Sequence, residues 1–507
     1  MSGRVLQILP QMDADRMLLG GKASSLVRLL DLGAAVPPAF VLTTEAFRDW
    51  ASNPDEESLI SLLKEGMSAL EQRTARRFGT GIGGLIVSVR SGAPVSMPGM
   101  MDTVLNVGIG TVADDSVPFL HDARSRFLYQ YAELVLDIEA GLLDYWRSIG
   151  TTTAALEKLM AAEAIRQGKR WPNTPVEELA GAAKAVFASW QSSRAKLYRR
   201  MKKIDESIGT TVTIQQMVFG NFDTESGSGV AFTRDPTTGA KGPCGEFLFG
   251  GQGEELVSGR ETASSLAEWR RRQPQAFQQL ETLGQRLEGA TSKVHEIEFT
   301  VEKGTFYVLQ CRPALLTARA GARVAVQMFT EGNISKAEAL AYAREHGFAS
   351  EASAKVLAVP AGAKQVGSGL AVGGGVSNGR VAFGESKMEE LRRAGDPAVL
   401  MTVETSPKSL PLMRRCAALV TMRGGATSHA AVVARELGTP CVVGVGGEIE
   451  GQSARMNESI SEGDWITVDG DSGLIFSGKA TTVAETLSDE ERQLREWATA
   501  GSASSQA

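Results

Sequence analysis

The segment that most constrains this chain is Thr421–Pro440, where a pair of glycines leads into a short apolar helix. Thr427 or Ser428 can cap that helix with its hydroxyl, and Gly438 suits a left-handed position at its C-terminal end. The proline that closes the segment prevents continuation. This spacing predicts a helix of roughly three turns whose first turn contains His429.

The predicted position of His429 favours chemistry with phosphate. The first backbone N–H groups of a helix are unpaired and its dipole is positive there, so a phosphate carried on the imidazole would be stabilised. A neutral imidazole is also a nucleophile near pH 7, because its unperturbed pKa is about 6.5. The alternative is a histidine in the capping region with no chemistry.

Composition bounds the class of protein. A chain of 507 residues is long enough for several domains, and a net charge of -6 gives no support for a nucleic-acid surface. The 4 cysteines are widely spaced without a C-x-x-C pair, which favours neither a zinc site nor a disulfide framework and fits a reducing cytosol. Without a long apolar N-terminal region or membrane-spanning run, we expect a cytoplasmic protein that does not insert into membranes.

Two segments of the N-terminal half carry candidate phosphate ligands. Gly20–Leu30 predicts a turn and an amphipathic helix with Lys22 at its start, although the alanine after this lysine excludes a Walker A loop. The β-branched run Leu85–Pro94 predicts a strand ending in Arg90, followed by the glycine-bearing loop Ser96–Asp102. An arginine beside such a loop can clamp phosphate. A solvated lysine and a surface strand are the alternatives.

The middle of the chain changes from helix to strand. Residues of about 112 to 208 have helical periodicity and many charges, which predicts a helical insertion. Thr211–Phe219 and Gly227–Gly239 are separated by a turn signal and are predicted to form β-hairpin material.

Two carboxylates alternate along the predicted strand Val294–Val301. Glu296 and Glu298 would point to one face of it, and the next strand would place Gln310 and Arg312 on one face. Adjacent carboxylates repel unless a cation lies between them, and hard oxygen ligands suit Mg²⁺. A hairpin would bring both polar faces together. The alternative is a half-exposed hairpin whose charges face water.

The C-terminal part returns to an α/β pattern. Residues 319–360 are rich in Ala and Glu and predict short connecting helices. Strands follow in Gly367–Gly384, Ala398–Val403 and Trp465–Phe476, alternating with the histidine-bearing helix, which predicts a compact α/β domain. The final residues predict one charged helix and a disordered small-residue tail.

Several of these motifs resemble the pyruvate phosphate dikinase and phosphoenolpyruvate synthase family. Gly424-Gly-Ala-Thr-Ser-His-Ala-Ala-Val-Val-Ala-Arg435 is similar to its phosphohistidine motif. Ser88-Val-Arg-Ser-Gly-Ala93 and Ser96–Asn106 resemble the arginine-bearing strand and the loop over the phosphates. Glu296-Ile-Glu-Phe-Thr300 and Leu309-Gln-Cys-Arg312 resemble the metal and phosphate ligands. The motifs occur in the expected order along almost the whole chain.

The resemblance implies a multidomain fold of α/β and α+β type. An ATP-grasp nucleotide-binding domain over 1–318, with a helical insertion at about 112–208, would precede a helical linker over 319–360, a swivelling phosphohistidine α/β domain over 361–481 and a tail over 482–507. ATP and Mg²⁺ are the implied cofactors. The implied catalytic residues are His429, Thr427, Ser428, Lys22 and Arg90. The implied nucleotide ligands are Lys22, Arg90, Arg126, Gln216, Met217, Val218, Glu296, Glu298, Gln310 and Arg312, with Glu296 and Glu298 holding the metal.

The implied activity is transfer of a phosphoryl group from ATP to His429, releasing AMP. The resemblance of the Ser96–Asn106 loop to the dikinases favours inorganic phosphate as co-substrate, with water as the alternative. The residues after the phosphohistidine domain are too few for a (β/α)₈ barrel of about 250 residues, so we expect an acceptor bound elsewhere, with a separate barrel subunit as one candidate. The chain alone is then not expected to interconvert pyruvate and phosphoenolpyruvate. The alternatives are a stand-alone phosphotransferase acting on a small molecule and a non-enzymatic nucleotide-sensing regulator.

Overall fold

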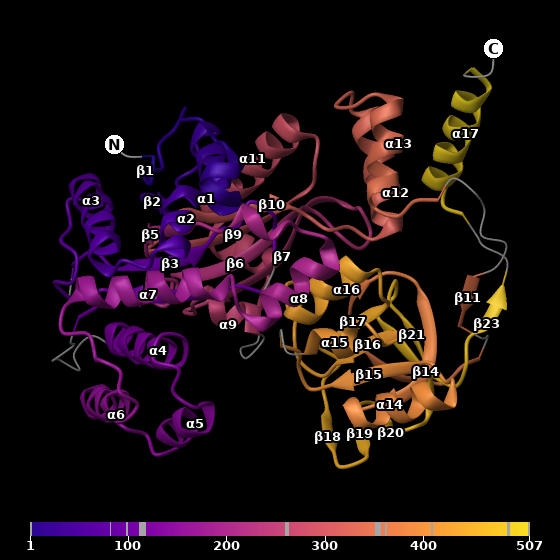
Figure 1. Ribbon diagram of the computed structural model, residues 1–507. Helices are drawn as coiled ribbons and strands as arrows, with labels where there is room; N and C mark the ends of the chain where they lie inside the picture. The colour runs from indigo at the N-terminus through magenta and orange to yellow at the C-terminus, as the bar shows by residue number, and fades with distance from the viewer. Residues whose placement is uncertain are drawn as a thin grey trace. The chain divides into compact units, whose positions relative to one another are not determined.

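The computed structural model divides the chain into two compact units, each described by itself (Figure 1). Unit 1 is Met1–Phe222 with Tyr307–Cys311, and unit 2 is Asp223–Phe306 with Arg312–Ala507. The structure describes residues 3–81, 83–97, 100–110, 118–258, 263–349, 356–359, 362–406, 409–483 and 487–504.

Parts of several predicted segments lie outside the described residues. These are Pro98 and Gly99 of the predicted phosphate loop, the start of the predicted insertion up to residue 117, residues 350–355 and 360 of the predicted linker, residue 361, and 484–486 and 505–507 of the predicted tail. The domain boundaries stay a prediction.

Unit 1 is built on an antiparallel five-stranded sheet in the order β1-β2-β5-β3-β4. The strands are β1 (Val5–Gln7), β2 (Ala39–Leu42), β5 (Val212–Gln216), β3 (Val87–Ser91) and β4 (Thr103–Val107). Its helices are α1 (Arg16–Asp31), α2 (Thr44–Ser52), α3 (Glu56–Thr74), α4 (Pro118–Leu134), α5 (Ala140–Ser148), α6 (Thr153–Arg166), α7 (Pro175–Ser189) and α8 (Ser193–Lys202). Helices α4 to α8 occupy the stretch in which helical periodicity was found.

Helix α1 is interrupted at Gly20, which has φ +74°. A Cβ at this position would lie 1.7 Å from the carbonyl oxygen of Gly92, so only glycine fits both the conformation and the space. The helix restarts after the interruption, which puts Lys22 in its first turn, as the sequence predicts. Gly21 donates its N–H to Ala93 O at 3.0 Å and anchors this turn against the end of β3.

Unit 2 contributes to a second five-stranded sheet, in the order β10-β9-β6-β7-β8. Its strands are β6 (Gly227–Arg234), β7 (Lys241–Phe249), β8 (Ser264–Ser265), β9 (His295–Glu302) and β10 (Thr305–Pro313). The helices α9 (Gly253–Ser258), α10 (Leu266–Arg272) and α11 (Pro274–Thr291) accompany it. The predicted neighbours β9 and β10 are confirmed.

Thr211–Phe219 and Gly227–Gly239, both predicted as β-hairpin material, do contain strands, but these strands do not pair with each other. Strand β5 pairs with β2 and β3, whereas β6 pairs with β7 and β9. Both edges of each strand are therefore taken by other partners, and local turn signals do not reveal which distant strands occupy an edge.

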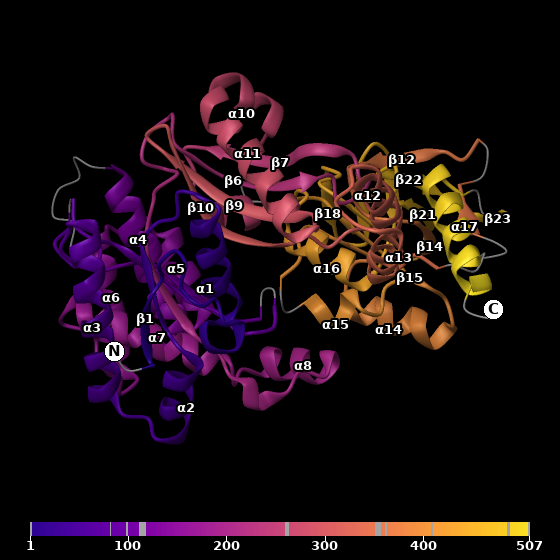
Figure 2. The ribbon, with the colours of Figure 1, turned by 90° about the horizontal axis from the view of Figure 1, so that it is seen from above.

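Helices α12 (Ala318–Thr330), α13 (Lys336–Glu345) and α17 (Asp489–Ser504) pack together and lie side by side (Figure 2). Leu494 of α17 is fully buried in the cluster that they form, and the rings of Phe329 and Trp497 meet edge-on at 4.7 Å. The segment expected to connect domains thus contributes to a hydrophobic core, together with the charged helix expected in the tail.

The remainder of unit 2 is an eight-stranded mixed sheet in the order β12-β22-β21-β14-β15-β16-β17-β13. Its central strands β14 to β17 run parallel. The strands are β12 (Gln365–Ser368), β13 (Leu370–Gly373), β14 (Val376–Ala382), β15 (Ala398–Thr402), β16 (Ala418–Thr421), β17 (Cys441–Val443), β21 (Trp465–Asp469) and β22 (Leu474–Ser477). The helices that accompany this sheet are α14 (Glu385–Ala394), α15 (Leu410–Met413) and α16 (His429–Leu437). Small sheets are formed by β11 (Val356–Ala358) with β23 (Thr481–Val483), and by β18 (Glu448–Glu450), β19 (Ser453–Arg455) and β20 (Ser459–Ser461).

The chain is a mixed α/β multidomain protein. Within the ranges given above, no helix is long and apolar enough to cross a membrane.

Candidate functional site

Helix α16 begins where the sequence predicts. Ser428 is its cap: it has extended backbone angles and accepts a hydrogen bond from Ala431 N at 3.4 Å. The helix runs for 9 residues from His429, and Gly438 ends it with φ +65°. It follows β16 and leads into β17, which puts the histidine beyond the carboxyl end of a parallel strand, where α/β sheets commonly bind ligands.

The imidazole of His429 is held through one nitrogen. Its Nδ1 lies 3.1 Å from the hydroxyl oxygen of Thr405, whereas Nε2 is buried without a hydrogen-bond partner in the described part of the chain. Burial lowers the pKa of His429 to about 4, so the ring is neutral at pH 7. If Nδ1–H donates to the Thr405 hydroxyl, the lone pair of the neutral ring lies on Nε2.

Thr405 was not singled out from the sequence. It follows β15, which is the parallel neighbour of β16, and the loops after two adjacent parallel strands meet at the same edge of a sheet. A search for hydroxyl residues directly after the strand that precedes the histidine motif would have found it.

The loop before His429 is also tied to Glu246 of β7, a residue that the sequence analysis missed. Its carboxylate accepts from Ala426 N at 3.3 Å and from the Thr427 hydroxyl at 3.2 Å, so Thr427 contacts this glutamate while Ser428 caps the helix. A Cβ at Gly425 would lie 1.9 Å from the same carboxylate. Burial raises the pKa of Glu246. Arg435 of α16 also holds this loop, because it donates to the carbonyl of Ala426.

The carboxylate pair lies on β9, next to the predicted arginine. The Arg312 guanidinium donates to Glu296 Oε1 at 2.6 Å. Burial disfavours its charge, but the carboxylates of Glu296 and Glu298 outweigh that effect and raise the pKa of Arg312. Unit 2 therefore brings together three of the residues implied by the family resemblance.

These carboxylates fit a magnesium ion that shares its ligands with a nucleotide. The described residues contain no group of three or more His, Cys, Asp or Glu side chains that could hold a metal by themselves. Mg²⁺ is commonly bound through one or two carboxylates, with phosphate oxygens and water completing its octahedral shell. Glu296 and Glu298 alternate on one strand and present such a donor pair.

Unit 1 gathers a second cluster at the end of β3. Arg90 donates to Gln310 Oε1 and to the carbonyl of Leu309, both at 3.1 Å. Lys22 Nζ donates to the carbonyl of Ser91 at 2.6 Å. These contacts place a lysine, an arginine and a glutamine from three distant segments beside one another.

The remaining predicted ligands of unit 1 lie at the end of β5 and on α4. Gln216 N donates to Pro38 O at 2.9 Å and Met217 N to Ile86 O at 2.8 Å, which continues the backbone pairing to Met217, just before Val218. Arg126 pairs with Asp122 one turn away on α4 at 2.7 Å.

Comparison of this chain with known proteins identifies its relatives. Residues 55–273 match the model of the pyruvate phosphate dikinase AMP/ATP-binding domain, and residues 394–473 match the mobile domain of phosphoenolpyruvate-utilising enzymes. The chain is 34% identical over 514 residues to the pyruvate, phosphate dikinase of Clostridium symbiosum, covering 95% of this chain and 59% of that protein. It is 36% identical over 532 residues to that of Rhizobium meliloti, covering 96% and 58%.

A chloroplastic relative, pyruvate, phosphate dikinase 1 of Oryza sativa, is 34% identical over 509 residues and is covered to 54% of its length. The chain thus spans somewhat more than half the length of these curated relatives. Two domain matches and this similarity along 95% of its residues lead to one conclusion: the chain belongs to the pyruvate phosphate dikinase family, in the part that carries the AMP/ATP-binding and mobile domains.

Proposed function

We propose that this chain is a phosphotransferase that moves a phosphoryl group from ATP to Nε2 of His429 and then to an acceptor. The observation that carries the proposal is the charge, position and hydrogen bonding of the His429 ring. Its ring is neutral, begins a helix, is held at Nδ1 by Thr405 and has Nε2 without a hydrogen bond among the described residues.

The hydrogen bond to Thr405 selects the reactive nitrogen. A neutral imidazole has one N–H and one lone pair, so a proton on Nδ1 that is donated to the Thr405 hydroxyl leaves the lone pair on Nε2. The unpaired N–H groups at the start of α16 would then stabilise the phosphoryl group.

Two clusters serve the nucleotide in this proposal. Lys22, Arg90 and Gln310 bind the phosphate oxygens, with the arginine offering a planar set of donors. Glu296 and Glu298 hold Mg²⁺, which when bound neutralises charge on the phosphates. Arg312 orients Glu296 through its hydrogen bond to Oε1.

The family resemblance supports the remaining roles. Arg126 would reach the nucleotide, and the adenine would lie against the backbone of Gln216, Met217 and Val218, at the end of a sheet strand. The nucleotide-binding domain would have the ATP-grasp fold, and the mobile domain would swivel to carry the phosphoryl group.

The reaction is proposed to release AMP and to use inorganic phosphate as co-substrate. The relatives are called pyruvate, phosphate dikinase, a name that gives pyruvate and phosphate as the substrates of those proteins and supports two phosphorylated products. For this chain we propose an acceptor bound outside units 1 and 2, for which a barrel subunit is one candidate.

The test is a product analysis with a labelled nucleotide. Purified chain is incubated with Mg·ATP, with and without phosphate, and AMP, ADP, pyrophosphate and protein-bound phosphate are resolved. We expect AMP together with an acid-labile, base-stable label in the wild type and in a His121→Ala control. His429→Ala should lose the label but keep ATP binding.

Each other outcome contradicts a defined part of the proposal. A label mapped to His121, His295 or His346 overturns the nucleophile. ADP as the only nucleotide product supports a simple small-molecule phosphotransferase. No turnover with ATP binding intact supports a nucleotide-sensing regulator.

A further inference from the structure

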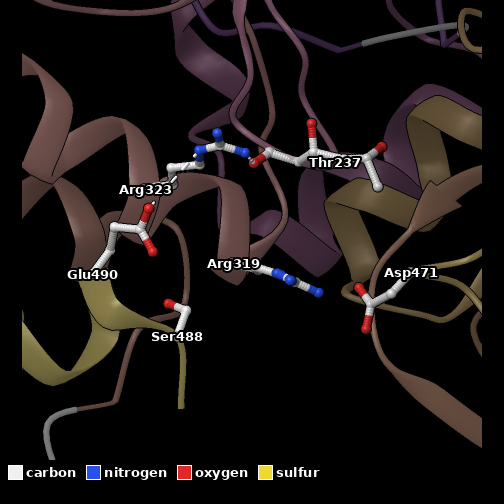
Figure 3. Close-up of a pocket in the computed structure, with 7 residues that line it drawn as sticks. Thr237, Arg319, Arg323, Asp471, Ser488 and Glu490 are labelled. Atoms are coloured by element: carbon white, nitrogen blue, oxygen red, sulfur yellow. Dashed lines mark hydrogen bonds and ion pairs between the residues drawn. The ribbon is translucent and has the colours of Figure 1, made fainter. Parts of the chain in front are cut away.

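Unit 2 contains a polar pocket of about 320 Å³ (Figure 3). His429 does not line it, and the proposed reaction uses none of the residues that do. Arg319 and Arg323 reach it from α12, Asp471 from the turn between β21 and β22, and Ser488 and Glu490 from the start of α17. Its volume is at the lower end of the range of about 300–1,000 Å³ for small-molecule sites. All the residues that line it are polar, so an occupant would be small and polar.

One side of this pocket holds an arginine and a glutamate that lie close to each other. Arg323 donates to the carbonyl of Thr238 at 3.3 Å, and its Nε lies 3.9 Å from Glu490 Oε1. This arginine and glutamate therefore form a long, partly exposed ion pair.

The other side carries two charges that do not pair. Arg319 points across the pocket toward Asp471 (Figure 3), yet among the described residues the two form no ion pair and neither pairs with another side chain. Asp471 is partly buried, which raises its pKa, and a backbone N–H of Gly375 is its hydrogen-bond donor. Asp471 and Arg319 attract each other across this space, but among the described residues no salt bridge joins them.

The position of Arg319 argues against a purely structural role. It lies in the first turn of α12, where the positive end of the helix dipole repels a cation, and Thr317 already caps this helix by accepting from Ala320 N at 3.2 Å. The arginine therefore costs helix stability where it stands. An anionic group placed before this turn would interact favourably with both the guanidinium and the helix end.

We propose that this pocket binds a small zwitterion of the α-amino acid class, with its carboxylate on Arg319 and its ammonium on Asp471. A simple anion would leave Asp471 unpaired beside it, and a simple cation would leave Arg319 unpaired. The Ser488 hydroxyl accepts from Glu491 N at 3.2 Å, so its own proton is available to the bound carboxylate. This inference does not depend on the proposed phosphoryl transfer.

The full chain is tested with defined probes. Each standard amino acid is added singly at about 10 mM, above the millimolar dissociation constants of weak sites, and unfolding temperature and heat of binding are measured. Propionate, ethylammonium and inorganic phosphate, at matched ionic strength, serve as probes with a single kind of charge. At least one amino acid is expected to bind saturably and to raise the unfolding temperature by about 3 °C, whereas the single-charge probes are not.

Variants separate this site from unspecific binding. Arg319→Gln and Asp471→Asn should each weaken binding by about tenfold or more, as expected when one partner of a charged contact is removed. Arg76→Gln, at an exposed arginine of unit 1, should bind as the wild type does. Arg319→Lys keeps the charge and should retain part of the affinity, which distinguishes a lost contact from a lost fold.

The proposal is overturned if no amino acid binds the wild type under these conditions. It is equally overturned if phosphate or propionate binds as tightly as the best amino acid and Asp471→Asn leaves that binding unchanged, since the pocket would then be a plain anion site.

Discussion

The buried state of His429 predicts how the protein responds to acid. The pKa of this histidine is lowered by burial to about 4, against about 6.5 in an unfolded chain. Between these values the unfolded state binds more protons than the folded state, so stability is lost as the pH falls from about 6.5 to about 4. The gap of roughly 2.5 units, at about 1.36 kcal/mol per unit, corresponds to about 3 kcal/mol. This is an upper figure, because the ring is partly accessible to water.

The assay is a proton NMR titration of the imidazole signals, supported by urea unfolding. The chain has 4 histidines, and His429→Gln identifies the signal that disappears. On lowering the pH from about 7.5 to about 5, wild-type stability should fall by up to about 2 kcal/mol more than that of the variant. A His429 signal that titrates near 6.5, or an equal pH response of both proteins, would refute the reasoning.

Three further changes test the contacts of the site. Thr405→Val removes the hydrogen bond to the histidine, worth about 0.5–1.5 kcal/mol, and should slow protein phosphorylation by roughly 2- to 13-fold in a single-turnover assay. The control Thr282→Val, on an exposed helix, should leave the rate unchanged, and equal rates for the two variants would argue against control of the tautomer by Thr405. Glu296→Gln weakens a mostly buried ion pair, so it should lower the free energy of unfolding in urea by about 1–3 kcal/mol and also reduce the Mg²⁺-dependent turnover of ATP. If neither quantity changes, this residue does not belong to the site. Gly20→Ala places a Cβ 1.7 Å from a backbone carbonyl oxygen at a residue with φ +74°, so it should lower the melting temperature of unit 1 or prevent its folding, as measured by circular dichroism. An unchanged melting temperature would mean that the interruption of α1 is not required.

The candidate site divides into residues that local patterns reveal and residues that they do not. Ser428, His429 and Gly438 form a cap, a first turn and a helix end, which depend on neighbours in sequence and were predicted together. Thr405 and Glu246 come from β15 and β7, so their contacts with the histidine loop depend on strand order, which local patterns do not contain.

The sequence by itself determined the helix start at His429, the alternation of Glu296 and Glu298 on one strand, and the turn that places Lys22 at the start of a helix, because each follows from short-range geometry. Tertiary structure decided which strands pair, as the separation of β5 and β6 into different sheets demonstrates. It also decided the protonation state of the histidine, since burial by distant segments sets its pKa. Solvent exclusion and strand pairing are properties of the assembled fold, and no window of local sequence contains them.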